Sequence, residues 1–355
     1  MSRTVKHFSL LRIGATELRV ISEVEDGVLP MIQIEEQIIQ SYSQQMHWPH
    51  AWVMFFVLDD FGPLLRQLRV SASKANLGAA GYDLSPRSLE ALGSRPMVNI
   101  YDMANLSGCN IYVNHQAMLR AGYWHDAAAI TGLLAHEHAH PLAENDTTRA
   151  SRALRLKVEP CLAPCPPLEM RFTQITGLLA GLVEKLCIFA GREIFTNQVT
   201  IEGGFASELA RLNLRNLSAL VDNLAGRQQL VQQLQAEVDR GDLTPDEVEL
   251  LLLIGDLEIH LPLALEIAPF HRAGRSAEAH ELEARLEKSV FPHLHPLVGP
   301  LYAVVEAACR RLPADGTPAE LAGWGRNTLD ILVGALAEKG LNLQARLLVE
   351  PGAGQ

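Results

Sequence analysis

The stretch Leu134-Ala135-His136-Glu137-His138-Ala139-His140 decides how the rest of this sequence is interpreted. It contains the pattern H-E-x-x-H at the end of an apolar run with helical spacing. Residues i and i+4 of an α-helix lie on one face, about one turn apart. The imidazoles of His136 and His140 are therefore predicted to lie side by side, where they can share one metal ion. Glu137 lies one step further round the helix, where it can reach a water molecule on that ion.

The composition limits the class of protein. The chain has 355 residues, 48% apolar and 20% charged, which is enough for one large domain or two medium ones. Its net charge is −11, and it shows no basic stripe of the kind found in nucleic-acid binders. No apolar run reaches the roughly 18 to 20 residues that span a bilayer, and no secretory signal is visible. We expect a cytoplasmic, soluble protein with no nucleic-acid or membrane partner.

Apolar patterns predict a mixture of strands and helices in the first part of the chain. Strands are expected as one or two segments within 8–23, and at 51–58, 97–101 and 110–114. The spacing of apolar residues predicts a helix over 31–46, a short helix over 64–70 and a loop over 71–95. Asp126 is the expected N-cap of a motif helix over 127–140.

The pattern changes after Pro141. Residues 141–167 look rich in loops, and from Leu168 onward the apolar spacing is almost only helical. The expected helices cover residues 168–199, 205–240, 245–268, 276–289, 297–311 and 318–348. A break is expected at Gly203-Gly204, and Thr244-Pro-Asp-Glu247 forms a capping box. The predicted fold class is α+β, with a small mixed sheet and the motif helix over 1–145 and an all-helical part over 146–355.

An H-E-x-x-H helix that follows a strand and precedes a helix with carboxylates resembles the zincin metallopeptidases. The resemblance covers roughly residues 97–200 and points to no single family among the zincins. It implies a Zn²⁺ cofactor, a peptide or protein substrate, and hydrolysis by metal-bound water with Glu137 as the general base. It also implies a zincin-like sheet whose last strand borders the cleft, with Tyr112 and Asn114 on that edge strand beside the substrate backbone.

A catalytic zinc ion takes three protein ligands and keeps a fourth position for water. In the gluzincin branch of the zincins, the third ligand is a Glu on a later helix, often in the pattern E-x-x-x-D. Glu193 begins E-x-x-x-N in this chain, with Asn197 in place of the usual Asp. Glu184 is the alternative on the same predicted helix.

A rival pattern, that of the metzincins, places Asp146 at the last ligand position. Glu144 is another i+4 step along the motif helix, too far from His136 if that helix runs straight. Either residue needs a break at His140, where the following Pro141 disfavours helical geometry. The third ligand therefore stays open among Glu193 and these alternatives.

Two further histidines complete the predicted site. His138 points away from the face that carries the two expected ligands, so we expect it in the cleft or on the surface. His260 lies in an apolar helical segment and is the candidate for stabilising the transition state. The alternative function is a non-catalytic or narrowly specific regulatory zincin-fold protein that binds a protein partner. Glu137 favours an enzyme, because a glutamate there has little structural purpose. The oligomeric state is left open.

Overall fold

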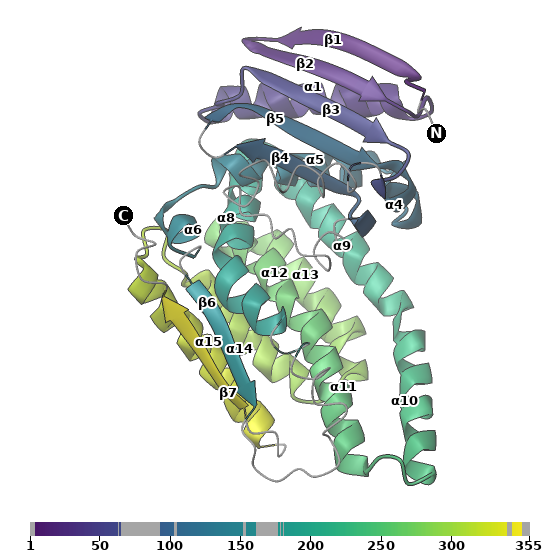
Figure 1. Cartoon of the computed structure of the whole chain (residues 1–355), viewed down its shortest axis with the longest axis vertical. Coiled ribbons are helices and arrows are strands. Elements are labelled where there is room, and N and C mark those ends of the chain that lie inside the picture. The colour runs from purple at the N-terminus through teal and green to yellow at the C-terminus, as the bar shows by residue number, and fades with distance from the viewer. Residues whose placement is uncertain are drawn as a thin grey trace. The chain divides into compact units, whose positions relative to one another are not determined.

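The computed structural model describes residues 4–62, 64, 93–102, 105–151, 154–160, 177, 179, 181–338 and 343–349. The chain forms two compact units (Figure 1). The first consists of Met1–Ala143 and Val199–Leu212, and the second of Glu144–Gln198 and Asn213–Gln355. The predicted division after residue 145 lies next to the first boundary, but a later segment returns to the first unit. The units are therefore not simply two halves of the chain.

A five-stranded sheet with the order β1-β2-β3-β5-β4 forms the first unit. Its strands are β1 (His7–Ile13), β2 (Thr16–Ser22), β3 (Trp52–Leu58), β4 (Met97–Asp102) and β5 (Asn105–Asn114). β2, β3 and β5 are parallel, whereas β1 and β4 are antiparallel to their neighbours and form the two edges. The mixed sheet is confirmed, and each strand predicted in this part of the chain is present.

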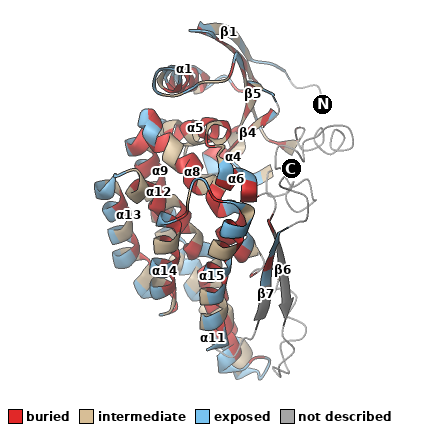
Figure 2. Ribbon diagram, turned by 90° about the vertical axis from the view of Figure 1, so that its left-hand side faces the viewer, coloured by how far each residue is buried: buried red, intermediate tan, exposed pale blue. Residues whose placement is uncertain are grey.

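One face of the sheet packs against α1 (Val28–Gln45) and α5 (Ala127–Leu142). Side chains alternate between the two faces of a strand, and the inward set is apolar. The core includes Val53, Phe55 and Val57 of β3, Ile111 of β5, Ile38 of α1 and Leu134 of α5, each fully buried. α1 also supplies the long crossover that the parallel strands β2 and β3 need, and Figure 2 shows it beside one face of the sheet. The predicted helices 31–46 and 127–140 are thus confirmed.

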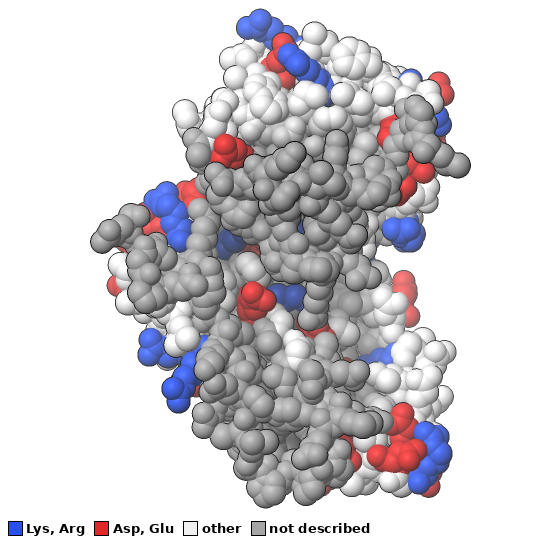
Figure 3. Space-filling model, viewed as in Figure 1, with Lys and Arg blue, Asp and Glu red and all other residues white. Residues whose placement is uncertain are grey.

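The opposite face of the sheet carries exposed apolar side chains beside the Arg19–Glu17 ion pair. Phe8 is 64% exposed, Leu10 58% and Trp52 37%. In the space-filling view, the described atoms over these strands are mostly uncharged (Figure 3). Tyr112 also lies on this face and stacks on Phe56 with ring centroids 4.8 Å apart.

Residues 199–212 complete the first unit beside α5. They comprise a π-helical segment, η4 (Ile201–Phe205), and the start of α9 (Ala206–Asp222). Gly204 has φ +94°, so the helix breaks at Gly203-Gly204 as predicted. A Cβ on Gly203 would lie 2.3 Å from the ring of Tyr42, and the Tyr42 hydroxyl donates to the Ala135 carbonyl at 2.8 Å. This tyrosine therefore ties α1 to both α5 and the returning segment.

The second unit is mainly helical. Its helices are α6 (Asp146–Ser151), η3 (Lys185–Phe189), α8 (Ala190–Thr200, up to Gln198), α9 from Asn213, α10 (Leu224–Asp239), α11 (Pro245–His260), η5 (Leu261–Leu263), α12 (Ala264–Arg272), α13 (Ser276–Ser289), η6 (Phe291–His293), α14 (Val298–Arg310) and α15 (Pro318–Ala337). The capping box at Thr244 is confirmed: its hydroxyl accepts the Glu247 N–H, and the Glu247 carboxylate accepts the Thr244 N–H. Among the described helices, none offers a stretch long and apolar enough to cross a bilayer.

The prediction of an all-helical second part is wrong in one place. β6 (Leu154–Pro160) and β7 (Leu343–Val349) form an antiparallel pair, and the helix expected to reach residue 348 ends at Ala337. Short apolar runs fit a helix or a strand equally well, and here pairing with a distant segment decides. The predicted short helix 64–70 lies outside the described residues, apart from Leu64. The predicted loop 71–95 does so as well, apart from residues 93–95.

Candidate metal centre

The helix α5 presents the motif. Asp126 caps its N-terminus by accepting the Ala129 N–H at 3.1 Å, as predicted. Pro141 lies inside the helix, which continues to Leu142 and is capped by Ala143. The break at His140 that Glu144 or Asp146 would need as a third ligand is therefore absent. Glu144 and Asp146 are therefore not brought to the two histidines by a break in this helix.

The helix accommodates Pro141 because another residue replaces the hydrogen bond that proline cannot make. A proline has no N–H to donate to the carbonyl four residues earlier, which here belongs to Glu137. The side-chain amide of Asn99, on β4, donates to that carbonyl at 2.9 Å. The carbonyl of Glu137 is thus satisfied from outside its own helix.

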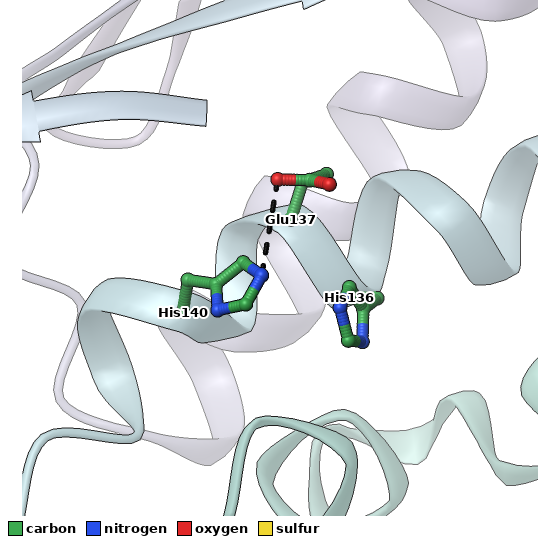
Figure 4. Close-up of side chains that lie close together, drawn as sticks. All are labelled: His136, Glu137 and His140. Carbon is green, nitrogen blue, oxygen red and sulfur yellow. Dashed lines mark ion pairs between the residues drawn. The ribbon is translucent and has the colours of Figure 1, made fainter. Parts of the chain in front are cut away.

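His136, Glu137 and His140 form one cluster. One nitrogen or oxygen atom of each lies within 4.8 Å of the others. The two imidazole rings have centroids 4.7 Å apart and are inclined by 79°. The Glu137 Oε2 lies 4.0 Å from the His140 Nε2, and Figure 4 shows the three side chains on adjacent turns of α5. The i, i+4 prediction for the two imidazoles is confirmed.

Glu137 is held by the edge strand of the sheet. Its side chain is only 10% exposed, and its Oε2 accepts the backbone N–H of Asn99 at 3.0 Å. Asn99 itself is fully buried. Reasoning from the sequence missed this residue, although a polar side chain inside the apolar strand and a proline after the motif were both visible. Together they signal a donor that replaces the helical N–H.

The donor set is of a kind that suits divalent transition-metal ions, zinc among them. Zinc prefers imidazole nitrogen, thiolate and carboxylate ligands in a tetrahedral arrangement. His136 and His140 offer two imidazoles that converge from one face of a single helix. A catalytic site needs one further ligand and keeps the fourth position open.

The candidates for the third ligand all belong to the second unit. Glu193 is half-buried on α8. It lies near Glu266, whose pKa is raised to about 7, mainly by burial and to a smaller extent by the negative charge of Glu193. Glu184 is exposed, and the Asp146 carboxylate, 63% exposed, pairs with Arg149. Glu193 stays the prediction for the third ligand.

His138 lies in the core rather than in the cleft or on the surface. Its side chain is fully buried, and its Nε2 lies 2.6 Å from an equally buried carboxylate oxygen of Glu35 on α1. The ring of Trp48 packs against it at 5.4 Å. The expectation was wrong because α5 is covered on the face opposite its metal ligands, where it meets α1. His138 fixes α5 to its neighbour.

The predicted place of Tyr112 and Asn114 on an edge strand is also wrong. β5 lies inside the sheet, paired with β3 on one side and β4 on the other. Ile111 and Val113 point into the core with α5, so Tyr112 points to the other face. The Asn114 side chain caps α4 (His115–Arg120) by accepting the Ala117 N–H at 3.1 Å. The edge beside the motif is β4.

His260 is at the C-terminus of α11 in the second unit. It is 4% exposed, and its Nδ1 donates to the Asp256 carbonyl at 2.7 Å. Burial lowers its pKa, while the Asp256 carbonyl opposes the shift. A neutral imidazole with one nitrogen committed fits a hydrogen-bonding role, and its part in catalysis stays a prediction.

A second cluster with similar groups lies within the second unit. His271, Glu283 and Glu306 have donor atoms within 4.8 Å of one another. Here Arg310 lies across both carboxylates, 2.7 Å from Glu283 and 2.5 Å from Glu306. The His271 Nε2 lies 2.8 Å from Glu283. Both carboxylates of this cluster are therefore already paired with the same guanidinium.

No family model, curated protein or solved structure matches this chain. The α5 cluster is therefore the feature from which a function can be inferred.

Proposed function

We propose that this protein is a zinc-dependent peptidase with its centre on α5. The observation that carries the proposal is the convergence of His136, Glu137 and His140 within 4.8 Å on one helix. The topology around them supports it, because α5 packs under a mixed sheet whose antiparallel edge strand β4 contacts the motif. A zincin-type peptidase would likewise hold its metal ion beside the edge of a sheet.

His136 and His140 would hold the ion, with Glu193 as the proposed third ligand. When bound, zinc polarises the scissile carbonyl and lowers the pKa of water towards 7. Glu137 takes the proton of the attacking water and passes it to the leaving amine. The Asn99 N–H, 3.0 Å from Oε2, holds the carboxylate in position for this role.

Among the described strands, β4 is the last one on its side of the sheet. The Asn114 N–H donates to the Pro96 carbonyl, so the backbone groups of Pro96, and by alternation those of Val98 and Ile100, face β5. Those of Met97, Asn99 and Tyr101 consequently face away from it. The Glu137 carboxylate already accepts the Asn99 N–H on this side, and the proposed peptide would lie alongside β4 next to that contact, as in the recognition of extended peptides at sheet edges.

Metal content tests this proposal directly. We expect purified protein to hold about one zinc ion per chain, measured by elemental mass spectrometry, and His140→Ala to lose it. His271→Ala, which alters the second cluster, is the matched control and should keep its zinc. Glu193→Gln should lower zinc affinity by more than about tenfold if it supplies the third ligand. Absence of zinc from the wild-type chain at neutral pH would overturn the site.

A further inference from the structure

We propose that Asn99 is a positioning residue for Glu137, and that Pro141 makes this possible by leaving the Glu137 carbonyl without its helical donor. This inference rests on the proposed function, since it concerns how the general base is held. It adds two residues to the centre that bind neither metal nor substrate through their side chains.

The contacts of Asn99 define the role. Its backbone N–H donates to the Glu137 carboxylate at 3.0 Å, and its side-chain amide donates to the Glu137 carbonyl at 2.9 Å. Asn99 of β4 is thus hydrogen-bonded to both the side chain and the backbone of Glu137 on α5. Because Asn99 is fully buried, water does not compete for these bonds.

Pro141 explains why the second bond forms. In an uninterrupted helix the N–H of residue 141 would donate to the carbonyl of Glu137. Proline removes that donor, and a buried carbonyl without a partner costs free energy. Asn99 fills the vacancy, so the helix is joined to β4 at the turn that carries the base rather than at a neighbouring turn.

The consequence for the reaction is geometric. A peptide paired with β4 takes its position from that strand, while the base takes its position from α5. Fixing Glu137 to Asn99 places both on the same reference element. Small displacements of a reacting group can cost large factors in rate, so loss of the bond should lower kcat more than it raises KM.

The test is a double-mutant cycle between positions 99 and 141. Asn99→Ala removes the amide donor, and Pro141→Ala returns a helical N–H to the Glu137 carbonyl. With denatured casein as the probe, we expect Asn99→Ala to lower kcat about tenfold, with KM within about twofold. In the Pro141→Ala background, the same change should lower kcat less than threefold. Thermal unfolding should show the same rescue, and zinc content should not change.

A matched control exists on the same pair of strands. The Asn110 side chain on β5 donates to the Ile100 carbonyl at 3.1 Å, away from the motif. Asn110→Ala removes an equivalent amide-to-carbonyl bond and should show neither the kcat effect nor coupling to Pro141. Asn99→Leu, close to Asn in shape but without a donor, repeats the test if the alanine variant folds poorly.

The outcomes separate this inference from the proposed function. Zinc-dependent cleavage by the wild type, combined with additive effects of Asn99→Ala and Pro141→Ala on kcat, would overturn the positioning role alone. A wild type that binds no zinc and cleaves nothing would overturn the peptidase and the positioning of a base with it. The unfolding cycle would then still decide whether both residues act on the Glu137 carbonyl.

Discussion

Two clusters of histidine and glutamate among the described residues contain the same kinds of side chain in different arrangements. The first takes all three side chains from five consecutive residues of α5. The second draws His271, Glu283 and Glu306 from α12, α13 and α14, and Arg310 lies across its carboxylates. In the second cluster, the guanidinium of Arg310 pairs with the carboxylates that a metal ion would otherwise bind.

This difference shows why the proximity of ligand-type residues is weak evidence for a metal site. Charged groups in a protein interior must be paired, and either a side chain or a metal ion can do this. The arrangement of the donors distinguishes the two cases. Two imidazoles that converge from one helix face leave a common point for an ion, whereas carboxylates bridged by arginine already have their counter-charge.

The largest expected difference between the clusters is in turnover. Glu137→Gln keeps the size of the side chain but removes the base, so kcat should fall about 10³-fold, or roughly 4 kcal/mol. Glu283→Gln should leave kcat within about twofold. Both are measured by the release of new peptide termini from denatured casein, with zinc content verified in each variant. Equal losses in the two variants would abolish the distinction.

Acid should weaken the first unit through a histidine behind its cluster. Trp48 packs against both His138 and His50, and burial lowers the pKa of His50 to about 4. The His50 Nδ1 donates to the Leu106 carbonyl at 2.6 Å, and its buried Nε2 has no hydrogen-bond partner for a second proton. Proton uptake is therefore favoured in the unfolded chain.

The sign of the effect follows from that pKa. The folded state binds fewer protons than the unfolded state between pH 6.5 and about 4, so stability falls as pH falls through this range. The total loss is about 3 kcal/mol. His50→Asn keeps a donor but does not titrate, and should flatten this part of the curve in chemical denaturation. An unchanged slope would exclude His50 as the cause.

The smallest expected effect concerns Arg310. Arg310→Met leaves Glu283 and the buried Glu306 without their counter-charge, and should cost about 2 kcal/mol of unfolding free energy. Added zinc should restore part of that stability by binding these two carboxylates and His271. Thermal unfolding with and without zinc measures this. If zinc gives this variant no more stability than it gives wild type, the second cluster cannot hold a metal even when vacated.

The sequence was sufficient for features set by local patterns. Strand runs such as 51–58, the cap at Asp126 and the pairing of His136 with His140 depend on residues close in the chain, and all are present. The antiparallel pair β6–β7 was missed because its strands are far apart in sequence and short apolar runs are ambiguous.

The errors at the site share one physical origin. The burial of His138 depends on Glu35, and the role of Asn99 depends on contact between β4 and α5. The continuation of α5 through Pro141 to Leu142 depends on that same contact. No helical wheel contains this information, because each partner comes from another element.

The return of residues Val199–Leu212 to the first unit also bears on how the protein is made. The Ser41 hydroxyl donates to the Gly203 carbonyl at 2.9 Å across 162 residues of chain. During synthesis, the motif helix leaves the ribosome about 70 residues before the end of this segment, an interval of about 4 to 14 seconds at common translation rates. For that time the nascent sheet and helix lack part of their covering. A chaperone, or the zinc ion of the proposed centre, would have the longest time to bind the incompletely covered unit in this interval.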